Sequence, residues 1–218
     1  MEGSFRDRAS AGLALAEGLA GYAWRPEVVV LGLVRGGMPV AAAVAARLGV
    51  ALDVLVIRKL GVPWAPEVAF GALGPGGVAV RNDDVAARLE QPDIERVLAR
   101  EEAELARREE RYRAGRPPLT LRGKVAVLVD DGLATGATAR AAVAVARALD
   151  AARVVLAVPV GSARALSALT PLVDELVCPV RPEPFGAVSQ FYDDFHQVTD
   201  GEVAAALRSG DVHPPGTV

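Results

Sequence analysis

Short apolar runs recur along the chain, and several are followed by a small or polar turn and then by a helix-forming segment. The runs cover residues 27–33, 52–58, 125–129, 152–160 and 173–178. The first and third are continuous and rich in β-branched residues, which is typical of strands covered on both faces of a parallel sheet. Because strands that alternate with helices form parallel βαβ units, the pattern predicts an α/β fold with an open, mostly parallel twisted sheet flanked by helices.

The segments between these strands carry helix signals. Helices are expected over residues 5–18, 38–49, 139–149 and 162–169. Pro39 suits a first helical turn, and Gly49 suits a C-terminal cap. Thr199 and Glu202 form a capping-box pattern that predicts a last helix through Leu207, ending at Ser209-Gly210.

Residues 61–118 break the alternation. Two apolar segments, 64–73 and 77–80, are separated by Gly74-Pro75-Gly76, and this predicts a β-hairpin. Residues 93–113 predict a helix with a narrow apolar stripe, and its many Glu and Arg residues favour a solvent-exposed helix with ion pairs. A dimer contact or a lid is the alternative role for this helix.

Composition narrows the class of protein. The chain has 218 residues, of which 51% are hydrophobic, so it can bury a substantial core. A net charge of −3 argues against bulk attraction to nucleic acid or to an anionic membrane. With no long apolar stretch and no signal peptide, the expected location is the cytoplasm. One cysteine, Cys178, excludes an intrachain disulfide, and two histidines make no zinc-ligand cluster.

The strand at residues 125–129 leads into two adjacent carboxylates, Asp130 and Asp131, and then into a small, hydroxyl-rich turn. Small side chains from Gly132 to Thr138 let backbone N–H groups approach an anion. A helix follows at once, and its N-terminus favours a phosphate. Since carboxylates accept hydrogen bonds from sugar hydroxyls, the pattern predicts a sugar-phosphate site. An acidic pair alone would equally suit a structural role or a generic metal site.

Two further segments carry fixed positive charge. The strand at residues 27–33 is followed by Val34-Arg35-Gly36-Gly37, which fits neither the dinucleotide fingerprint nor a Walker A sequence. Taken alone, this loop would be an ordinary turn between strand and helix. Lys59 is placed with Arg58 at the carboxyl end of the strand at 52–58, where two cations could meet a pyrophosphate or could simply be solvated.

The string from Val127 to Thr138 resembles the substrate-binding motif of the type I phosphoribosyltransferases, and Val34 to Gly37 is similar to their pyrophosphate loop. The resemblance implies phosphoribosyl pyrophosphate as substrate and Mg²⁺ as cofactor, bound mainly through the substrate and further by Asp130 and Asp131. These two carboxylates would hold the ribose hydroxyls, and with Arg35 they would be the catalytic residues. The implied substrate-binding residues are Val34, Arg35, Gly36, Gly37, Lys59, Asp130, Asp131, Ala134, Thr135, Gly136, Ala137 and Thr138.

The resemblance also implies a domain organisation. Residues 1–218 would form a single domain, with a core at about 20–60 and 119–178 and a flexible hairpin and helical insertion at about 61–118. A small hood at about 179–208, together with the N-terminal segment, would face the acceptor. Phe185 and Tyr192 are the candidate acceptor contacts, with packing of the hood as the alternative role for their rings.

The implied function is that of a pentosyltransferase of nucleotide metabolism. It would transfer the phosphoribosyl group to a nitrogenous acceptor, with a nucleobase favoured, and release pyrophosphate. Ala134 replaces the aspartate of the hypoxanthine-guanine and xanthine enzymes and points to the adenine and uracil types, whereas Leu33 to Gly37 is more similar to bacterial xanthine-guanine enzymes, so the base stays open.

Three alternatives remain: a non-catalytic regulator that senses phosphoribosyl pyrophosphate or a nucleotide, a relative of the synthetase that makes this substrate, and an assembly protein with a vestigial pocket. The expected partners are phosphoribosyl pyrophosphate and a small-molecule acceptor, with neither nucleic acid nor membrane. We expect a homo-oligomer, with a dimer favoured.

Overall fold

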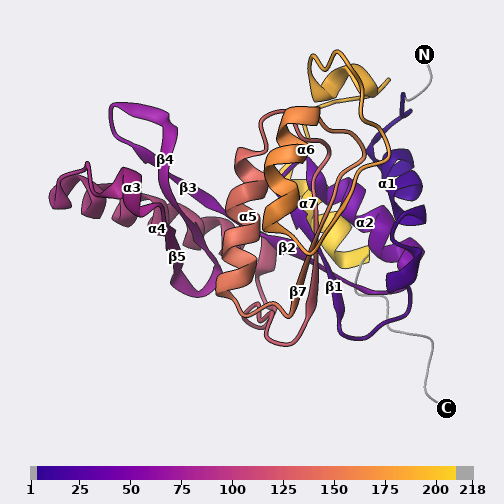
Figure 1. Ribbon diagram of the computed structural model, residues 1–218. Coiled ribbons are helices and arrows are strands. Elements are labelled where there is room, and N and C mark those ends of the chain that lie inside the picture. The colour runs from indigo at the N-terminus through magenta and orange to yellow at the C-terminus, as the bar shows by residue number, and fades with distance from the viewer. Residues whose placement is uncertain (1–3, 210–218) are drawn as a thin grey trace.

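The computed structural model describes residues 4–209, and within them the strands form a parallel and an antiparallel sheet (Figure 1). The parallel sheet has five strands in the order β2-β1-β6-β7-β8. Its strands are β1 (Val28–Leu33), β2 (Ala51–Leu55), β6 (Val125–Val129), β7 (Arg153–Ala157) and β8 (Glu175–Val177). The predicted open α/β sheet is therefore confirmed.

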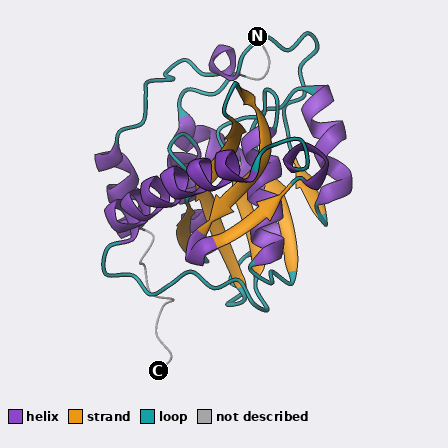
Figure 2. Cartoon of the chain, turned by 90° about the vertical axis from the view of Figure 1, so that its left-hand side faces the viewer, coloured by secondary structure: helices purple, strands orange, loops and turns teal. Residues whose placement is uncertain are grey.

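Helices cover both faces of the parallel sheet (Figure 2). One face carries α1 (Arg8–Glu17), α2 (Gly37–Leu48) and α7 (Asp200–Ser209), and the other carries α5 (Ala137–Ala148) and α6 (Ala163–Leu169). Alternate residues of one strand enter different cores: Val125, Val127 and Val129 lie in the first, and Ala126 and Leu128 in the second. Strands buried on both sides need apolar residues at every position, which explains the continuous runs in the sequence.

The helix ends follow the local signals. Gly49 caps α2 with a φ of 65°, a left-handed conformation that favours glycine. The predicted capping box of α7 is present, because the Glu202 amide donates to the Thr199 hydroxyl at 3.2 Å and the Thr199 amide donates to the Glu202 carboxylate at 2.8 Å. Gly210, the expected end of this helix, lies outside the described residues. Short 3₁₀ helices occur at Ala20–Tyr22, Pro75–Gly77, Thr170–Leu172 and Val188–Phe191.

The second sheet lies in an arm that extends from the parallel sheet (Figure 1). The arm consists of β3 (Arg58–Val62), β4 (Ala65–Gly74), β5 (Val78–Arg81), α3 (Asp83–Ala86) and α4 (Gln91–Arg113). The hairpin prediction is confirmed by the antiparallel pairing of β4 with β5.

The predicted strand at 52–58 is wrong at its end. β1 ends at Leu33, whose partner is Leu55, so the chain beyond Leu55 has no parallel neighbour to pair with. It joins β4 instead, with Arg58 opposite Leu73. Arg58 and Lys59 therefore open an antiparallel strand rather than close a parallel one.

Helix α4 is only partly the solvent-exposed helix that its composition predicts. Its outer face carries the expected ion pairs, such as Glu104 with Arg107. Its inner face packs against β3 and β4 and buries two charged residues. Glu101 accepts from Arg58 at 2.8 Å, and Arg113 donates two hydrogen bonds to Asp53 at 3.0 and 2.9 Å. The Arg113–Asp53 pair thus fixes the arm to β2 of the main sheet, whereas the Glu101–Arg58 pair joins two elements within the arm. No helix within residues 4–209 is both long and apolar enough to cross a membrane.

Removing the carboxylate of Asp53 should destabilise the fold, because it leaves the Arg113 guanidinium buried without its partner. We expect Asp53→Ala to lower the free energy of unfolding by about 3 kcal/mol, measured by urea denaturation. Glu27→Ala, which removes a carboxylate from the exposed ion pair with Arg25, is the control and should change little. Equal losses in the two variants would contradict a structural role for the buried pair.

Candidate functional site

Two loops meet at the carboxyl ends of the neighbouring strands β1 and β6. Gly36 and Gly37 of the first loop pack directly against Asp130 and Asp131 of the second. A Cβ atom added to Gly37 would lie 2.9 Å from the Asp130 Cα, and one added to Gly36 would overlap the Asp131 carboxylate. The glycine pair is therefore required by this close approach, and the two motifs that the sequence singles out form one site.

A cavity of about 420 Å³ opens over this junction. Four of the candidate site residues, Arg35, Gly36, Asp130 and Asp131, line it. The remaining lining residues are Arg8, Phe195, His196, Gln197 and Val198. We call this space the acidic cavity.

A second hollow, of about 180 Å³, adjoins the first at Asp130 and follows the turn from Gly132 to Ala139. We call it the turn hollow. Gly136 has a φ of 76° and occupies the N-cap position of α5, where it offers no capping side chain. Thr135 and Thr138 are exposed on this turn. Backbone amides at a helix N-terminus that lack a side-chain cap are suited to bind an anion such as phosphate.

Arg8, which the sequence did not single out, is the direct partner of the acidic pair. It lies in the first turn of α1 with 7% of its surface exposed, and its Nε donates to Asp131 Oδ2 at 2.9 Å. Its Nη1 donates to the His196 carbonyl at 2.8 Å, and its guanidinium lies 3.9 Å from the Phe195 ring centre. These contacts hold Asp131 in one orientation and join α1 to the segment before α7.

The two carboxylates have unequal electrostatic surroundings. Burial, together with the neighbouring charge of Asp131, raises the pKa of Asp130 well above its ordinary value. Burial also raises the pKa of Asp131, while Arg8 opposes that rise. Arg8 is thus paired with Asp131, and the pKa of Asp130 is raised further than that of Asp131.

The candidate hood residues pack inward. Tyr192 is 6% exposed, and its hydroxyl donates to the Asp131 carbonyl oxygen at 2.6 Å. The Phe185 ring stacks on Phe191 with centres 5.7 Å apart, and Phe5 pairs with Tyr192 as an isolated β-bridge. For Tyr192, packing rather than an open stacking face is what the structure shows. Phe195 is the aromatic residue of this segment that lines the acidic cavity.

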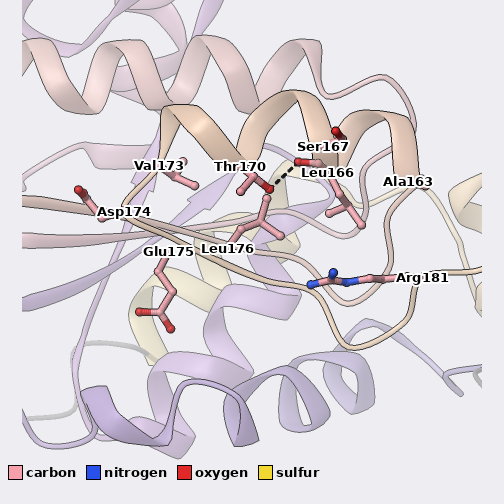
Figure 3. Close-up of a pocket in the computed structure, with 9 residues that line it drawn as sticks. All are labelled: Ala163, Leu166, Ser167, Thr170, Val173, Asp174, Glu175, Leu176 and Arg181. Carbon is pink, nitrogen blue, oxygen red and sulfur yellow. Dashed lines mark hydrogen bonds between the residues drawn. The ribbon is translucent and has the colours of Figure 1, made fainter.

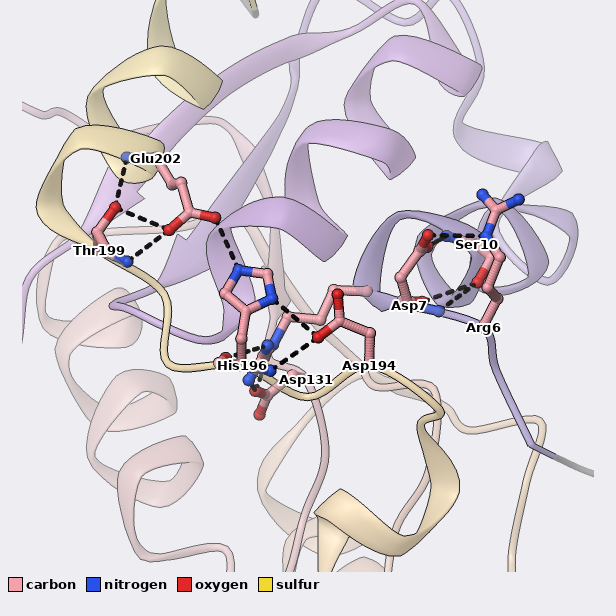
Figure 4. Close-up of polar contacts among 9 residues, drawn as sticks. Arg6, Asp7, Ser10, Asp131, Asp194, His196, Thr199 and Glu202 are labelled. Atoms are coloured by element: carbon pink, nitrogen blue, oxygen red, sulfur yellow. Dashed lines mark hydrogen bonds and ion pairs between the residues drawn. The ribbon is translucent and has the colours of Figure 1, made fainter.

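His196 lies at the rim of the acidic cavity between two carboxylates (Figure 4). Its Nε2 lies 2.8 Å from Glu202 Oε1, and its Nδ1 lies 3.0 Å from Asp194 Oδ1. Both hydrogen bonds raise the pKa of His196, and the one to Glu202 has the larger effect. Because Glu202 also caps α7, the histidine ties the cavity rim to that helix.

Two candidates lie away from this centre. Lys59 lines a different cavity, between the arm and α5, and its Nζ donates to the Glu67 carbonyl at 3.3 Å. Val34 is half-buried against the core, and its peptide bond to Arg35 is cis.

Cys178 is buried, as expected, and burial raises the pKa of its thiol to about 11.

A hollow of about 520 Å³ at the edge of the sheet contains no residue of either loop (Figure 3). Its charged side chains already have partners, with Glu175 bound to Arg153 and Asp174 to Arg147. Within residues 4–209, no group of three or more His, Cys, Asp or Glu side chains is placed to hold a metal ion. Two carboxylates alone suit a cation that takes most of its oxygen ligands from a bound substrate.

Comparison with known proteins agrees with this geometry. Residues 8–196 match the family described as phosphoribosyl transferase domain. Two curated proteins of Mycobacterium tuberculosis, named "Putative phosphoribosyl transferase MT0597" (strain CDC 1551 / Oshkosh) and "Putative phosphoribosyl transferase Rv0571c" (strain ATCC 25618 / H37Rv), are each 51% identical to this chain over 205 residues. The match covers 93% of this chain but only 46% of either relative, so the chain spans about half of their length.

Among solved structures, TT1426 from Thermus thermophilus is 46% identical, with a TM-score of 0.86. The match covers 94% of this chain and 97% of that structure. At this similarity the two chains share their architecture over nearly their whole lengths.

The raised pKa of Asp130 has a consequence for stability. A carboxyl whose pKa is higher in the folded state favours folding below its unfolded pKa, and this contribution is lost as the pH rises through the folded pKa. We therefore expect Asp130→Asn to be more stable than the wild type at about pH 8, with the difference shrinking towards about pH 4. Urea denaturation across this range measures it. A loss of stability in Asp130→Asn at both ends of the range would refute the assignment.

Proposed function

The chain belongs to the phosphoribosyl transferase domain family, and from this premise we propose that it uses phosphoribosyl pyrophosphate with Mg²⁺ to transfer the phosphoribosyl group to a nitrogenous acceptor, with release of pyrophosphate. A nucleobase is the acceptor that we favour. One observation carries the proposal: the acidic pair, the arginine-glycine loop and the amide-rich turn meet at one edge of the sheet, around two adjoining hollows.

Each part of the site suits one part of this substrate. The turn from Ala134 to Thr138 offers amides and two hydroxyls to the 5′-phosphate. Asp130 and Asp131 accept hydrogen bonds from the ribose hydroxyls, and Arg8 fixes the direction in which Asp131 faces. The sugar phosphate would thus span both hollows, with its ribose over their shared residue, Asp130.

The pyrophosphate would then lie in the acidic cavity beside Arg35. As the bond between C1′ and the pyrophosphate oxygen breaks, its electron pair leaves with the pyrophosphate, and positive charge develops on the ribose. Arg35 and the amides of Gly36 and Gly37 stabilise the departing anion. The lone pair of the acceptor nitrogen forms the new bond to C1′, and the proton that this nitrogen carried is released to the solvent. Mg²⁺, when bound, would neutralise charge on the pyrophosphate, and Asp130 and Asp131, which line the acidic cavity, are the carboxylates that would hold it.

A second candidate function is a regulator that binds phosphoribosyl pyrophosphate or a nucleotide without turnover. It is favoured by the Arg8 contact, since one oxygen of Asp131 is already engaged by a buried cation before any ligand arrives. Both functions need the same ligand site, and they differ only in whether pyrophosphate is released.

Calorimetric titration with phosphoribosyl pyrophosphate tests the shared site. We expect binding that requires Mg²⁺ and weakens about tenfold or more in Asp131→Asn, because a charged hydrogen-bond acceptor is lost. Gly37→Val should weaken binding at least as much, since its side chain separates the two loops. Asp150→Asn changes an exposed carboxylate outside both hollows and should bind as the wild type does. Absence of Mg²⁺-dependent binding at millimolar ligand would contradict the proposal.

Release of pyrophosphate separates the enzyme from the regulator. The full chain is incubated with phosphoribosyl pyrophosphate, Mg²⁺ and each of a panel of purine and pyrimidine bases. Release that depends on one base supports transfer and identifies the acceptor. Tight binding with no release for any base supports the regulator.

A further inference from the structure

A cavity of about 370 Å³ lies between the arm and helix α5, beside the transfer site that the acidic cavity and the turn hollow form. We call it the arm cavity. Its lining residues are Lys59, Glu67, Ala69, Gly71, Ala72, Val80, Arg81, Asn82, Thr135, Ala137, Arg140, Ala141 and Ala144. We propose that the arm cavity is a second anion site, which binds a phosphorylated small molecule that also has an apolar part, such as a nucleotide.

Three cations from three elements surround this space. Lys59 comes from β3, Arg81 from the end of β5 and Arg140 from the first turns of α5. All three are exposed, and within residues 4–209 none of them forms an ion pair, whereas the cavity-lining Arg8 and Arg58 are paired with Asp131 and Glu101. Glu67 is the single acid among the lining residues. A concave surface on which three cations outnumber one acid has a net positive charge and attracts anions.

The rest of the lining, which we call the floor of the arm cavity, is mainly apolar and made of small side chains. Ala72 and Val80 contribute from the arm, and Ala141 and Ala144 contribute from α5. The volume lies within the usual range for small-molecule sites, about 300–1,000 Å³. A bare phosphate would satisfy the cations but leave this floor in water. A ligand with a phosphate at the cations and a flat apolar part over the floor covers both.

The arm cavity is distinct from the acidic cavity, with which it shares no residue. It does touch the turn hollow, because Thr135 and Ala137 line both. The first turn of α5 is therefore a common wall between the two phosphate-binding surfaces. This position also accounts for Lys59, which the sequence placed with the pyrophosphate loop and which the structure places with Arg81 and Arg140.

Fluorescence titration of the full chain with the nucleotide probe TNP-ATP tests the site. We expect the double variant Arg81→Ala/Arg140→Ala to bind the probe at least tenfold more weakly than the wild type. The control is Arg88→Ala/Arg164→Ala, which removes two exposed arginines elsewhere and changes the net charge equally. It should alter the affinity less than twofold. Equal weakening in both double variants would show a general charge effect and overturn the proposal.

The variant Asp131→Asn tests whether the probe binds in the arm cavity or in the transfer site. Its acidic cavity is altered while the arm cavity is intact, so probe binding should be unchanged. Loss of the probe in Asp131→Asn, with retention in Arg81→Ala/Arg140→Ala, would place the probe in the transfer site and overturn the second site. If the arginine pair controls the probe while phosphoribosyl pyrophosphate fails to bind the wild type, the proposed function fails and the second site stands.

Discussion

The adjacent carboxylates at the end of β6 are the constraint around which the rest of the site is arranged. Two like charges in a largely buried place repel each other, and both lose solvation. Three contacts hold this pair: the buried Arg8 guanidinium of α1 bonds to Asp131, the Tyr192 hydroxyl donates to the Asp131 carbonyl, and the Gly36-Gly37 loop packs against both residues. Segments from both ends of the chain therefore converge on one pair of residues.

Most of the parallel sheet could be predicted, because the signal for each buried strand lies within the strand's own sequence. Strands covered on both faces need apolar residues throughout, and β1 and β6 show that pattern directly. The change from β2 to β3 could not be predicted, since it depends on where the neighbouring strand β1 ends. The buried face of α4 was missed for a similar reason. The sequence near Glu101 indicates an exposed charge, because its partner Arg58 lies 43 residues away in the chain and meets it only in the folded structure.

The two loops of the candidate site were predictable because each is continuous in sequence. Arg8 was not, since it lies 123 residues from Asp131. One signal was nevertheless available: Arg8 shares a helical face with Ala11 and Leu15, and a charged residue on an apolar face needs a buried partner. For Tyr192, composition suggested an aromatic surface for a base, but it could not reveal that the ring is buried and that its hydroxyl has a backbone acceptor.

The apolar side chains of the arm belong to the same core as the main sheet. Leu60 and Phe70 from the arm share that core with Leu52 of β2 and Val203 of α7. The arm is therefore not a cassette that recombination could exchange between relatives while leaving the remainder untouched. A different arm would require compensating changes in the apolar side chains of β2 and α7 that pack against it. These segments are therefore expected to change together as the family diverges.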